Sequence, residues 1–273
     1  MKLLHRSLLA AASLPAALLL AHAQAQAQIS VVSPSFSYTQ GFDTLTISTT
    51  ATPWVNDSTL PGWSLINSAG AAAATLVAGT GSSNAGSFYS FGAAGNAERA
   101  LGGAASGGAY FGSPAAGAIA GWMVVAFTNN TGASIDNFSF GYDGEQWRNG
   151  GNTSAQTLVM EYGVGTSFAG VVSWTAPGGN ADFTSPVVGA TAAAVDGNGA
   201  GLLAGLGGSY TGLSWAAGQT LYVRFVERND LGNDHGLALD NFRFSVTAVP
   251  EPGTVALWLA GLGAIAFVAR RRG

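Results

Sequence analysis

Hydrophobic and polar residues alternate in several short segments of the middle of the chain. Successive side chains of a β-strand point to opposite faces, so this alternation predicts strands that are buried on one face. The segments are residues 134–142, 157–162, 219–228 and 237–247. The residues that we expect to face a core are Phe138, Phe140, Tyr142, Leu158, Met160, Tyr162, Leu221, Val223, Phe225, Phe242, Phe244 and Val246.

The remaining pattern also favours strands over helices. Residues 118–128 form an apolar run that ends at a turn signal, Asn129-Asn130-Thr131-Gly132. Residues 102–108 and 197–208 are rich in Gly and Ala, and we expect them to be loops. No segment of the body shows a capped stripe of helical period. We therefore predict an all-β domain over residues 28–248, a jelly-roll or lectin-like antiparallel β-sandwich.

The N-terminal residues 1–27 have the order of a secretory signal peptide. Lys2 and Arg6 make a basic start, an apolar stretch follows, and small residues recur at the end. We expect signal peptidase to cleave after Ala23, Ala25 or Ala27.

The C-terminal residues 249–273 combine three features in a fixed order. Pro250, Glu251 and Pro252 come first, an uncharged apolar run spans residues 253–269, and Arg270, Arg271 and Arg272 follow. A membrane-spanning helix needs about 17–25 apolar residues, so the run predicts a minimal transmembrane helix. The arginines favour a cytoplasmic C-terminus. The alternative is a buried core helix.

This tail resembles the PEP-CTERM sorting signal of Gram-negative bacteria. The resemblance implies that an exosortase, a membrane-embedded enzyme, recognises the motif and cleaves near it. It also implies export across the inner membrane, transient anchoring there, and delivery to the cell surface or the extracellular space. A sortase signal would need Leu-Pro-x-Thr-Gly, which is absent, and a GPI signal normally ends in apolar residues.

Composition narrows the chemistry of the body. The chain has no cysteine, which excludes disulfides, thiolate metal sites and a cysteine nucleophile. Between the two ends there are five arginines and thirteen acidic residues, a formal charge of −8. A protein that binds nucleic acid needs a basic surface, so this charge excludes nucleic acid as a predicted partner.

Catalytic signatures are absent as well. There is no Gly-x-Ser-x-Gly, no phosphate-binding Gly-x-x-x-x-Gly-Lys and no His-Glu-x-x-His. His235 is the only histidine of the body, so zinc sites built from several histidines are excluded. We predict that the protein is not an enzyme and has no cofactor, with calcium left open.

Two polar clusters stand out, residues 142–152 and 224–241, and both follow predicted strands, so we expect them at strand ends or in loops. With residues 87–92 and 98–102, they resemble a group of exported bacterial β-sandwich domains. Those domains carry Gly-Glu-Gln-Trp-Arg and end in Asn-Asp-His-Gly-Leu-Ala-Leu-Asp-Asn-Phe. The group has no settled activity, so the resemblance implies a fold rather than a function.

Three kinds of site can be drawn from these clusters. A flat indole and planar polar groups suit a sugar, and the candidate ligand-binding residues are Glu145, Gln146, Trp147, Arg148, Asn149, Asn152, Arg224 and His235. Hard oxygen ligands suit calcium, and the candidates are Asp230, Asn233, Asp234 and Asp240. A hydrolase would use Glu145 with Asp240, or His235 as a base.

Each site has a structural alternative. Asp and Asn can simply shape the turn between two strands. Trp147 can be a core anchor, with Glu145 or Asp240 neutralising a partly buried Arg148 or Arg224.

The sequence therefore predicts an exported structural or adhesive protein associated with exopolysaccharide at the surface or in the extracellular matrix. The alternative is a carbohydrate-binding module, with or without calcium, and a hydrolase is the third hypothesis.

Overall fold

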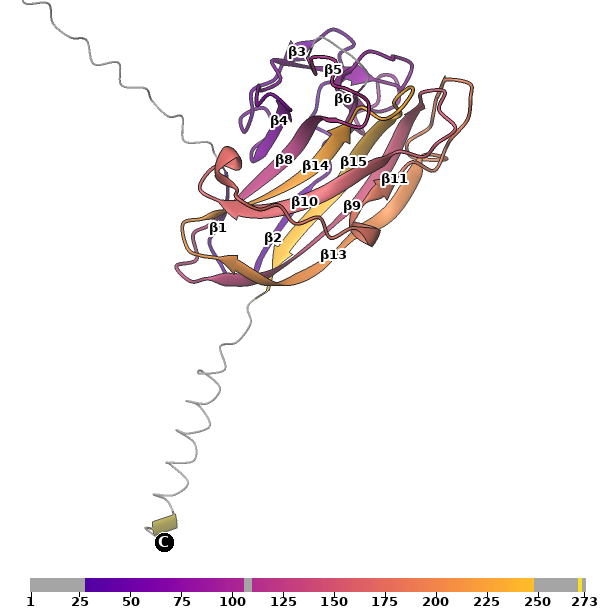
Figure 1. Cartoon of the computed structure of the whole chain (residues 1–273). Helices are drawn as coiled ribbons and strands as arrows, with labels where there is room; N and C mark the ends of the chain where they lie inside the picture. The colour runs from indigo at the N-terminus through magenta and orange to yellow at the C-terminus, as the bar shows by residue number, and fades with distance from the viewer. Residues whose placement is uncertain (1–27, 106–109, 248–269, 272–273) are drawn as a thin grey trace, which may run out of the picture.

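The computed structural model describes residues 28–105, 110–247 and 270–271, and the first two ranges form two facing β-sheets (Figure 1). The six-stranded sheet has the order β1-β8-β14-β10-β11, with β4 also paired to β8. Its strands are β1 (Ile29–Val31), β4 (Trp63–Asn67), β8 (Ile119–Asn129), β10 (Thr157–Gly165), β11 (Phe183–Thr184) and β14 (Thr220–Arg228).

The nine-stranded sheet has the order β12-β9-β15-β7-β6-β5-β3, with β13 beside β9 and β2 beside β15. Its strands are β2 (Phe36–Gln40), β3 (Thr52–Pro53), β5 (Thr75–Gly79), β6 (Ser87–Phe91), β7 (Ala100–Ala104), β9 (Ile135–Asn149), β12 (Ala193–Ala194), β13 (Leu202–Trp215) and β15 (Gly236–Val246). Two pairings, β1 with β8 and β5 with β6, are parallel, and the others are antiparallel. The predicted all-β sandwich is confirmed.

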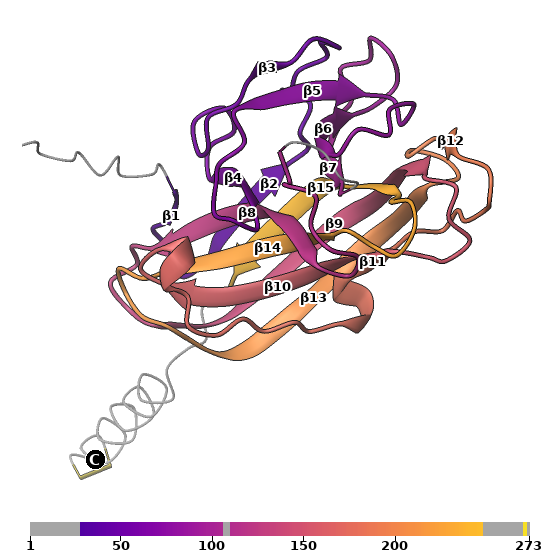
Figure 2. The same cartoon turned by 45° about the horizontal axis from the view of Figure 1, so that its top comes forward.

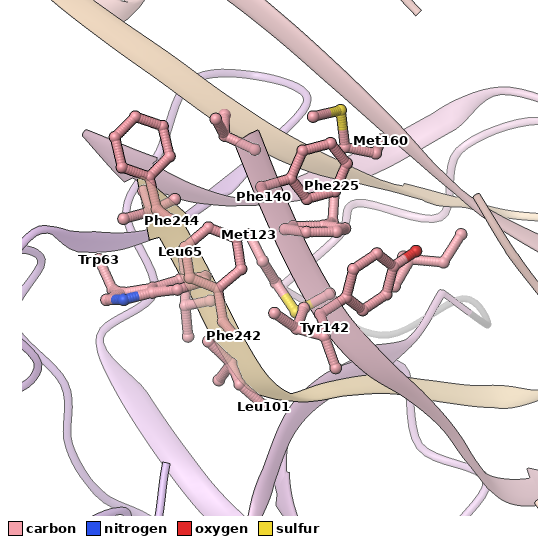
Figure 3. Packing of buried hydrophobic residues seen from close by; sticks show 14 of the residues in the cluster. Trp63, Leu65, Leu101, Met123, Phe140, Tyr142, Met160, Phe225, Phe242 and Phe244 are labelled. Carbon is pink, nitrogen blue, oxygen red and sulfur yellow. The ribbon is translucent and has the colours of Figure 1, made fainter. Parts of the chain in front are cut away.

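Aromatic side chains from the two sheets meet in the core (Figure 3). Phe127 of β8 stacks on Phe244 of β15 with ring centroids 3.8 Å apart. Tyr142 of β9 meets Phe225 of β14 edge to face at 5.0 Å. Full burial of a large apolar side chain is worth about 1.5–3 kcal/mol, so these contacts are a main source of the attraction between the sheets.

The alternation in the sequence placed the core residues correctly. On β14, Leu221, Val223 and Phe225 lie in the main core, whereas Tyr222 lies in a separate apolar cluster on the outer face. Tyr162, also predicted to face inward, is partly buried against the core.

The two Gly- and Ala-rich segments were predicted as loops, and both predictions are partly wrong. Strand β7 includes Gly102 and Gly103, and β13 begins at Leu202. A Cβ on Gly102 would lie 2.2 Å from the carbonyl oxygen of Leu237 on β15, so glycine permits this close approach of two strands.

Helical structure is slight in the described part of the body. It consists of two short 3₁₀ turns, η1 (Phe168–Gly170) and η2 (Gly179–Ala181). Among the described residues, no helix is long and apolar enough to cross a membrane. The predicted signal peptide, residues 1–27, and the predicted transmembrane helix, residues 253–269, lie outside the described residues.

Candidate functional site

Three carboxylates meet on the outer face of the nine-stranded sheet. Glu98 lies just before β7, Asp240 lies on β15 and Glu145 lies on β9, and these strands are neighbours in the order β7, β15, β9 (Figure 2). One carboxylate oxygen from each residue lies within 4.8 Å of the other two. We call Glu98, Glu145 and Asp240 the carboxylate trio.

Strand geometry explains why these side chains share a face. Leu239 points into the main core, so its neighbour Asp240 points outward. Ala238 is paired with Glu145 across the strands, and Asp240 with Asp143. Asn241 then adopts a left-handed conformation with φ of 49°, at a bulge that returns Phe242 to the core.

The trio is only partly hydrogen-bonded. Oε2 of Glu145 accepts a hydrogen bond of 2.7 Å from Nε1–H of Trp147, and Oε2 of Glu98 accepts one of 2.6 Å from the side-chain amide of Asn198. Oδ1 of Asp240 and Oε1 of Glu98 are buried and have no hydrogen-bond partner. Glu145 is 1% exposed and Asp240 4% exposed.

Burial and mutual repulsion change the ionisation of the trio. Burial raises the pKa of Glu145 to about 8, and the nearby Asp240 adds to the rise. Burial raises the pKa of Asp240 to about 7, with further contributions from Glu98, Asp43 and Asp143. Both carboxyls therefore resist ionisation unless a positive charge joins them.

Trp147 was a candidate platform for a sugar, but its indole has no open face. The side chain is 3% exposed, and its ring stacks in parallel on Phe91 at 6.3 Å between centroids. Gly197 also packs closely against the indole: a Cβ added to Gly197 would lie 2.3 Å from Cε2 of Trp147. The position matches the alternative interpretation, in which Trp147 is a packing anchor.

The two polar clusters were expected in loops or at strand ends, and this expectation is partly wrong. Residues 143–149 belong to β9 and residues 236–241 belong to β15. β9 and β15 pair with each other, so the backbone N–H and C=O groups of these residues take part in the hydrogen bonds of the sheet.

The parts of the clusters that lie beyond the strands pack against each other. The backbone N–H of Gly150 donates to Nδ1 of His235 at 3.0 Å, and the amide of Asn152 donates to the carbonyl oxygens of Leu231 and Asn233. His235 is 2% exposed, and burial lowers its pKa. These hydrogen bonds join the two segments directly, and Nε2 of His235 is buried between described residues without a hydrogen-bond partner.

The other predicted ligand residues of β9 also bind the protein itself. Gln146 exchanges hydrogen bonds with the backbone of Val187, and the Asn149 amide donates to Gly189 and Thr191. Nη1 of Arg148 donates to the carbonyl oxygens of Gly81 and Ser82. A ligand role for these residues stays a prediction.

Arg224 lies on the other sheet, away from the trio. Its guanidinium binds Glu161 of β10, with Nη2 2.5 Å and Nε 2.7 Å from Oε2. It also stacks over Trp174 at 3.6 Å from the ring centroid. The predicted neutralisation of Arg224 by Glu145 or Asp240 is wrong, because Glu161 is its partner.

The predicted calcium ligands are divided between two places. Asp230, Asn233 and Asp234 lie in the turn before β15, where the backbone N–H of Asp230 donates to Oδ1 of Asp234. Asp240 belongs to the trio instead. Sequence reasoning missed Glu98 as a site residue. Glu98 comes two residues before Ala100, which lies on the outer face of β7, and residues two apart in extended backbone point the same way, so this spacing could have marked Glu98 as outward-facing.

A hollow of about 460 Å³ is lined by residues of β5 and β6 of the same sheet and by Arg99, the chain neighbour of Glu98. Tyr89 lines the hollow and stacks on Phe91 with ring centroids 5.0 Å apart. Phe91 in turn stacks on Trp147, whose indole donates to Glu145. Most of the surface of the hollow is apolar, and the hydroxyl-bearing residues among those that line it are Thr49, Thr80, Ser82, Ser83, Ser87 and Tyr89. We call this cavity the hydroxyl-lined hollow.

Comparison with known families identifies the tail. The family described as the PEP-CTERM protein-sorting motif matches residues 248–272. The chain ends in a PEP-CTERM motif. A PEP-CTERM motif marks an exported protein of Gram-negative bacteria that is processed by an exosortase, so the predicted sorting signal is confirmed. Its residues Pro250, Glu251, Pro252 and Arg272 lie outside the described residues.

Comparisons of the whole PEP-CTERM chain add little about the body. No curated protein matches it. Among solved structures, it is similar to the CBM22-1 xylan-binding domain of Paenibacillus barcinonensis Xyn10C. That match has 10% identity and a TM-score of 0.28, and covers 57% of this chain and 78% of the other. A similarity at this level carries no weight for fold or ligand.

Proposed function

We propose that this protein is a non-enzymatic structural or adhesive component of the cell surface or extracellular matrix, associated with exopolysaccharide. The observation that carries the proposal is the PEP-CTERM motif on a strand-built body. Signal peptidase removes the N-terminal segment, and exosortase acts at the tail after transient anchoring in the inner membrane.

The state of the polar clusters supports a structural role. The residues that a hydrolase would use, Glu145, Asp240 and His235, are all at least 95% buried, so a polymer has no access to them as they stand. The polar side chains of both clusters bind neighbouring backbone instead. A body of this kind is suited to a structural role outside the cell rather than to catalysis.

The sorting part of the proposal can be tested in a Gram-negative host that has an exosortase. We expect mass spectrometry to find the wild-type protein in the surface or matrix fraction, without residues 1–27 and without the tail. Replacement of Pro250, Glu251 and Pro252 by alanine should leave uncut protein in the inner membrane. Replacement of Ser154, an exposed body residue, by alanine is the control and should be sorted normally. Intact wild-type chain found only in the cytosol would contradict the proposal.

A carbohydrate-binding function is the second candidate, and the hydroxyl-lined hollow favours it. Small-molecule sites typically enclose about 300–1,000 Å³, and hydroxyls suit the hydrogen-bonding of sugars. The hollow has the size of such a site, at about 460 Å³.

A plugging variant tests this candidate. Ser82 is exposed and lines the hollow, so Ser82→Trp should fill it without disturbing the core. On a glycan array, the candidate predicts saturable binding by the wild type that falls at least tenfold in Ser82→Trp but persists in Ser154→Trp. Equal binding by both variants would exclude the hollow as the site.

A further inference from the structure

The carboxylate trio has the donor set of a cation site. Carboxylate oxygens are the ligands that hard divalent cations prefer, and Ca²⁺ binds them at about 2.3–2.6 Å. Two oxygens on one such ion are therefore at most about 5 Å apart. One oxygen from each of Glu98, Glu145 and Asp240 lies within 4.8 Å of the other two, so one ion can reach all three carboxylates.

A second observation points to a ligand independently of the acidic cluster. Oδ1 of Asp240 is buried without a hydrogen-bond partner, on a side chain that is 4% exposed. Oε1 of Glu98 is also buried without a partner, on a side chain that is only half-buried. A buried carboxylate oxygen without a partner costs several kcal/mol, so nearly all such groups in native proteins are satisfied. The backbone N–H of Asn241 is a donor to the Asp240 carboxyl, but among the described residues none donates to Oδ1 of Asp240 or to Oε1 of Glu98.

The trio also lacks an ion-paired arginine among the described residues. In the described part of the chain, none of the three carboxylates forms an ion pair with an arginine. Arg99 follows Glu98 and interacts with it electrostatically, but the guanidinium of Arg99 donates its hydrogen bonds to Ser90 and Ala93. Asp43 and Asp143 lie near enough to add negative charge.

We propose that Glu98, Glu145 and Asp240 form a calcium site that clamps β7, β15 and β9 together. Three carboxylates can supply up to six oxygens, and Ca²⁺ takes six to eight. Mg²⁺ is the weaker fit, because it keeps most of its water shell and a site buried to this degree leaves little room for water.

The clamp would extend beyond the three strands. Asn198 donates to Glu98 and belongs to the loop between β12 and β13 that also covers Trp147. Calcium would therefore hold this loop as well as the strands. This inference does not depend on the proposed function, since a bound ion stabilises the fold whatever the protein does outside the cell.

Calorimetric titration of the full chain in mild detergent, after removal of metal by a chelator, tests the proposal at pH 8. We expect one Ca²⁺ per chain. We also expect the melting temperature to rise by about 5–10 °C when Ca²⁺ exceeds its Kd about 100-fold. Glu145→Gln and Asp240→Asn should each weaken binding at least tenfold. Asp136→Asn removes an exposed carboxylate from the same strand β9 and is the matched control, with unchanged affinity.

Three results would overturn the proposal. The first is a wild-type protein that shows neither binding heat nor a change in melting temperature with Ca²⁺, because the trio would then hold protons alone. The second is equal affinity for Mg²⁺. If a buried variant fails to fold, Glu98→Gln provides the same test at the less buried member of the trio, and an unchanged Ca²⁺ affinity there also overturns the assignment.

Discussion

The indole Nε1–H of Trp147 donates a 2.7 Å hydrogen bond to Oε2 of Glu145, two residues earlier on the same strand. Residues two apart on a strand share a face, so β9 itself sets this contact. The bond lowers the pKa of Glu145 and thereby opposes part of the rise that burial causes. Trp147 thus packs against Phe91 and also supports a buried carboxylate.

Trp147→Phe keeps an aromatic ring but removes the donor to Glu145. We expect the free energy of unfolding at pH 8 to fall by about 1–3 kcal/mol, the usual cost of a buried acceptor that loses its donor. Trp122→Phe is a matched control, since its Nε1 is buried without a hydrogen-bond partner and no bond is lost. Urea denaturation measures both variants. A loss in Trp122→Phe as large as that in Trp147→Phe would contradict the role of the hydrogen bond.

The trio should make the metal-free protein less stable as pH rises. The folded-state pKa is about 8 for Glu145 and about 7 for Asp240, above the ordinary carboxyl range. The stability of a carboxyl with a raised pKa is fully present below its unfolded pKa, near 4, and is lost as pH rises through the folded value.

Denaturation in chelator from pH 4 to pH 9 checks this dependence. We expect the wild type to lose stability across the range, and Glu145→Gln with Asp240→Asn to lose markedly less. Other buried carboxyls, such as Glu227, act in the same direction, so the comparison of the two curves isolates the trio. Parallel curves would show that Glu145 and Asp240 do not titrate in this way.

The sequence pattern was sufficient for the core but not for the trio. Leu221, Val223 and Phe225 follow one another at every second position, so the inward face of β14 can be predicted from neighbouring residues alone. Glu98 and Asp240 meet because β7 pairs with β15, and this pairing of distant segments cannot be read from local spacing. Gly102 was assigned to a loop because glycine is common in loops, whereas here it allows two strands to come close.

Glu227 should lower the free energy of unfolding at high pH. It lies on β14 and is 4% exposed, and its Oε1 has no hydrogen-bond partner. Burial raises its pKa well above the ordinary value, with further contributions from Asp234 and Asp230. The group is therefore favourable when protonated and costs stability as pH rises toward its folded-state pKa.

Replacement by glutamine keeps the shape and removes the charge. We expect Glu227→Gln to raise the unfolding free energy more at pH 8 than at pH 5, because the raised pKa of Glu227 makes its charged form more costly to the folded state as pH rises. Urea denaturation at the two pH values measures the difference, and the wild type at pH 5 is the internal control. An equal loss at both pH values would mean that Glu227 has a specific structural partner.

Arg224 holds the outer face of the six-stranded sheet together, and lysine should not replace it. The guanidinium binds Glu161 through two nitrogens and lies 3.6 Å from the ring centroid of Trp174. A planar fork can make both contacts at once, whereas an ammonium cannot.

We expect Arg224→Lys to lower the unfolding free energy by about 1–3 kcal/mol, in line with hydrogen bonds to charged groups and a partly desolvated cation–π contact. Arg228→Lys on the same strand is the control. Its Nη1 makes one hydrogen bond to the carbonyl oxygen of Gly117, so its loss should stay within about 0.5 kcal/mol. Denaturant midpoints compare the two variants. Equal midpoints for both variants would show that charge alone, without the planar geometry, accounts for the contribution of Arg224.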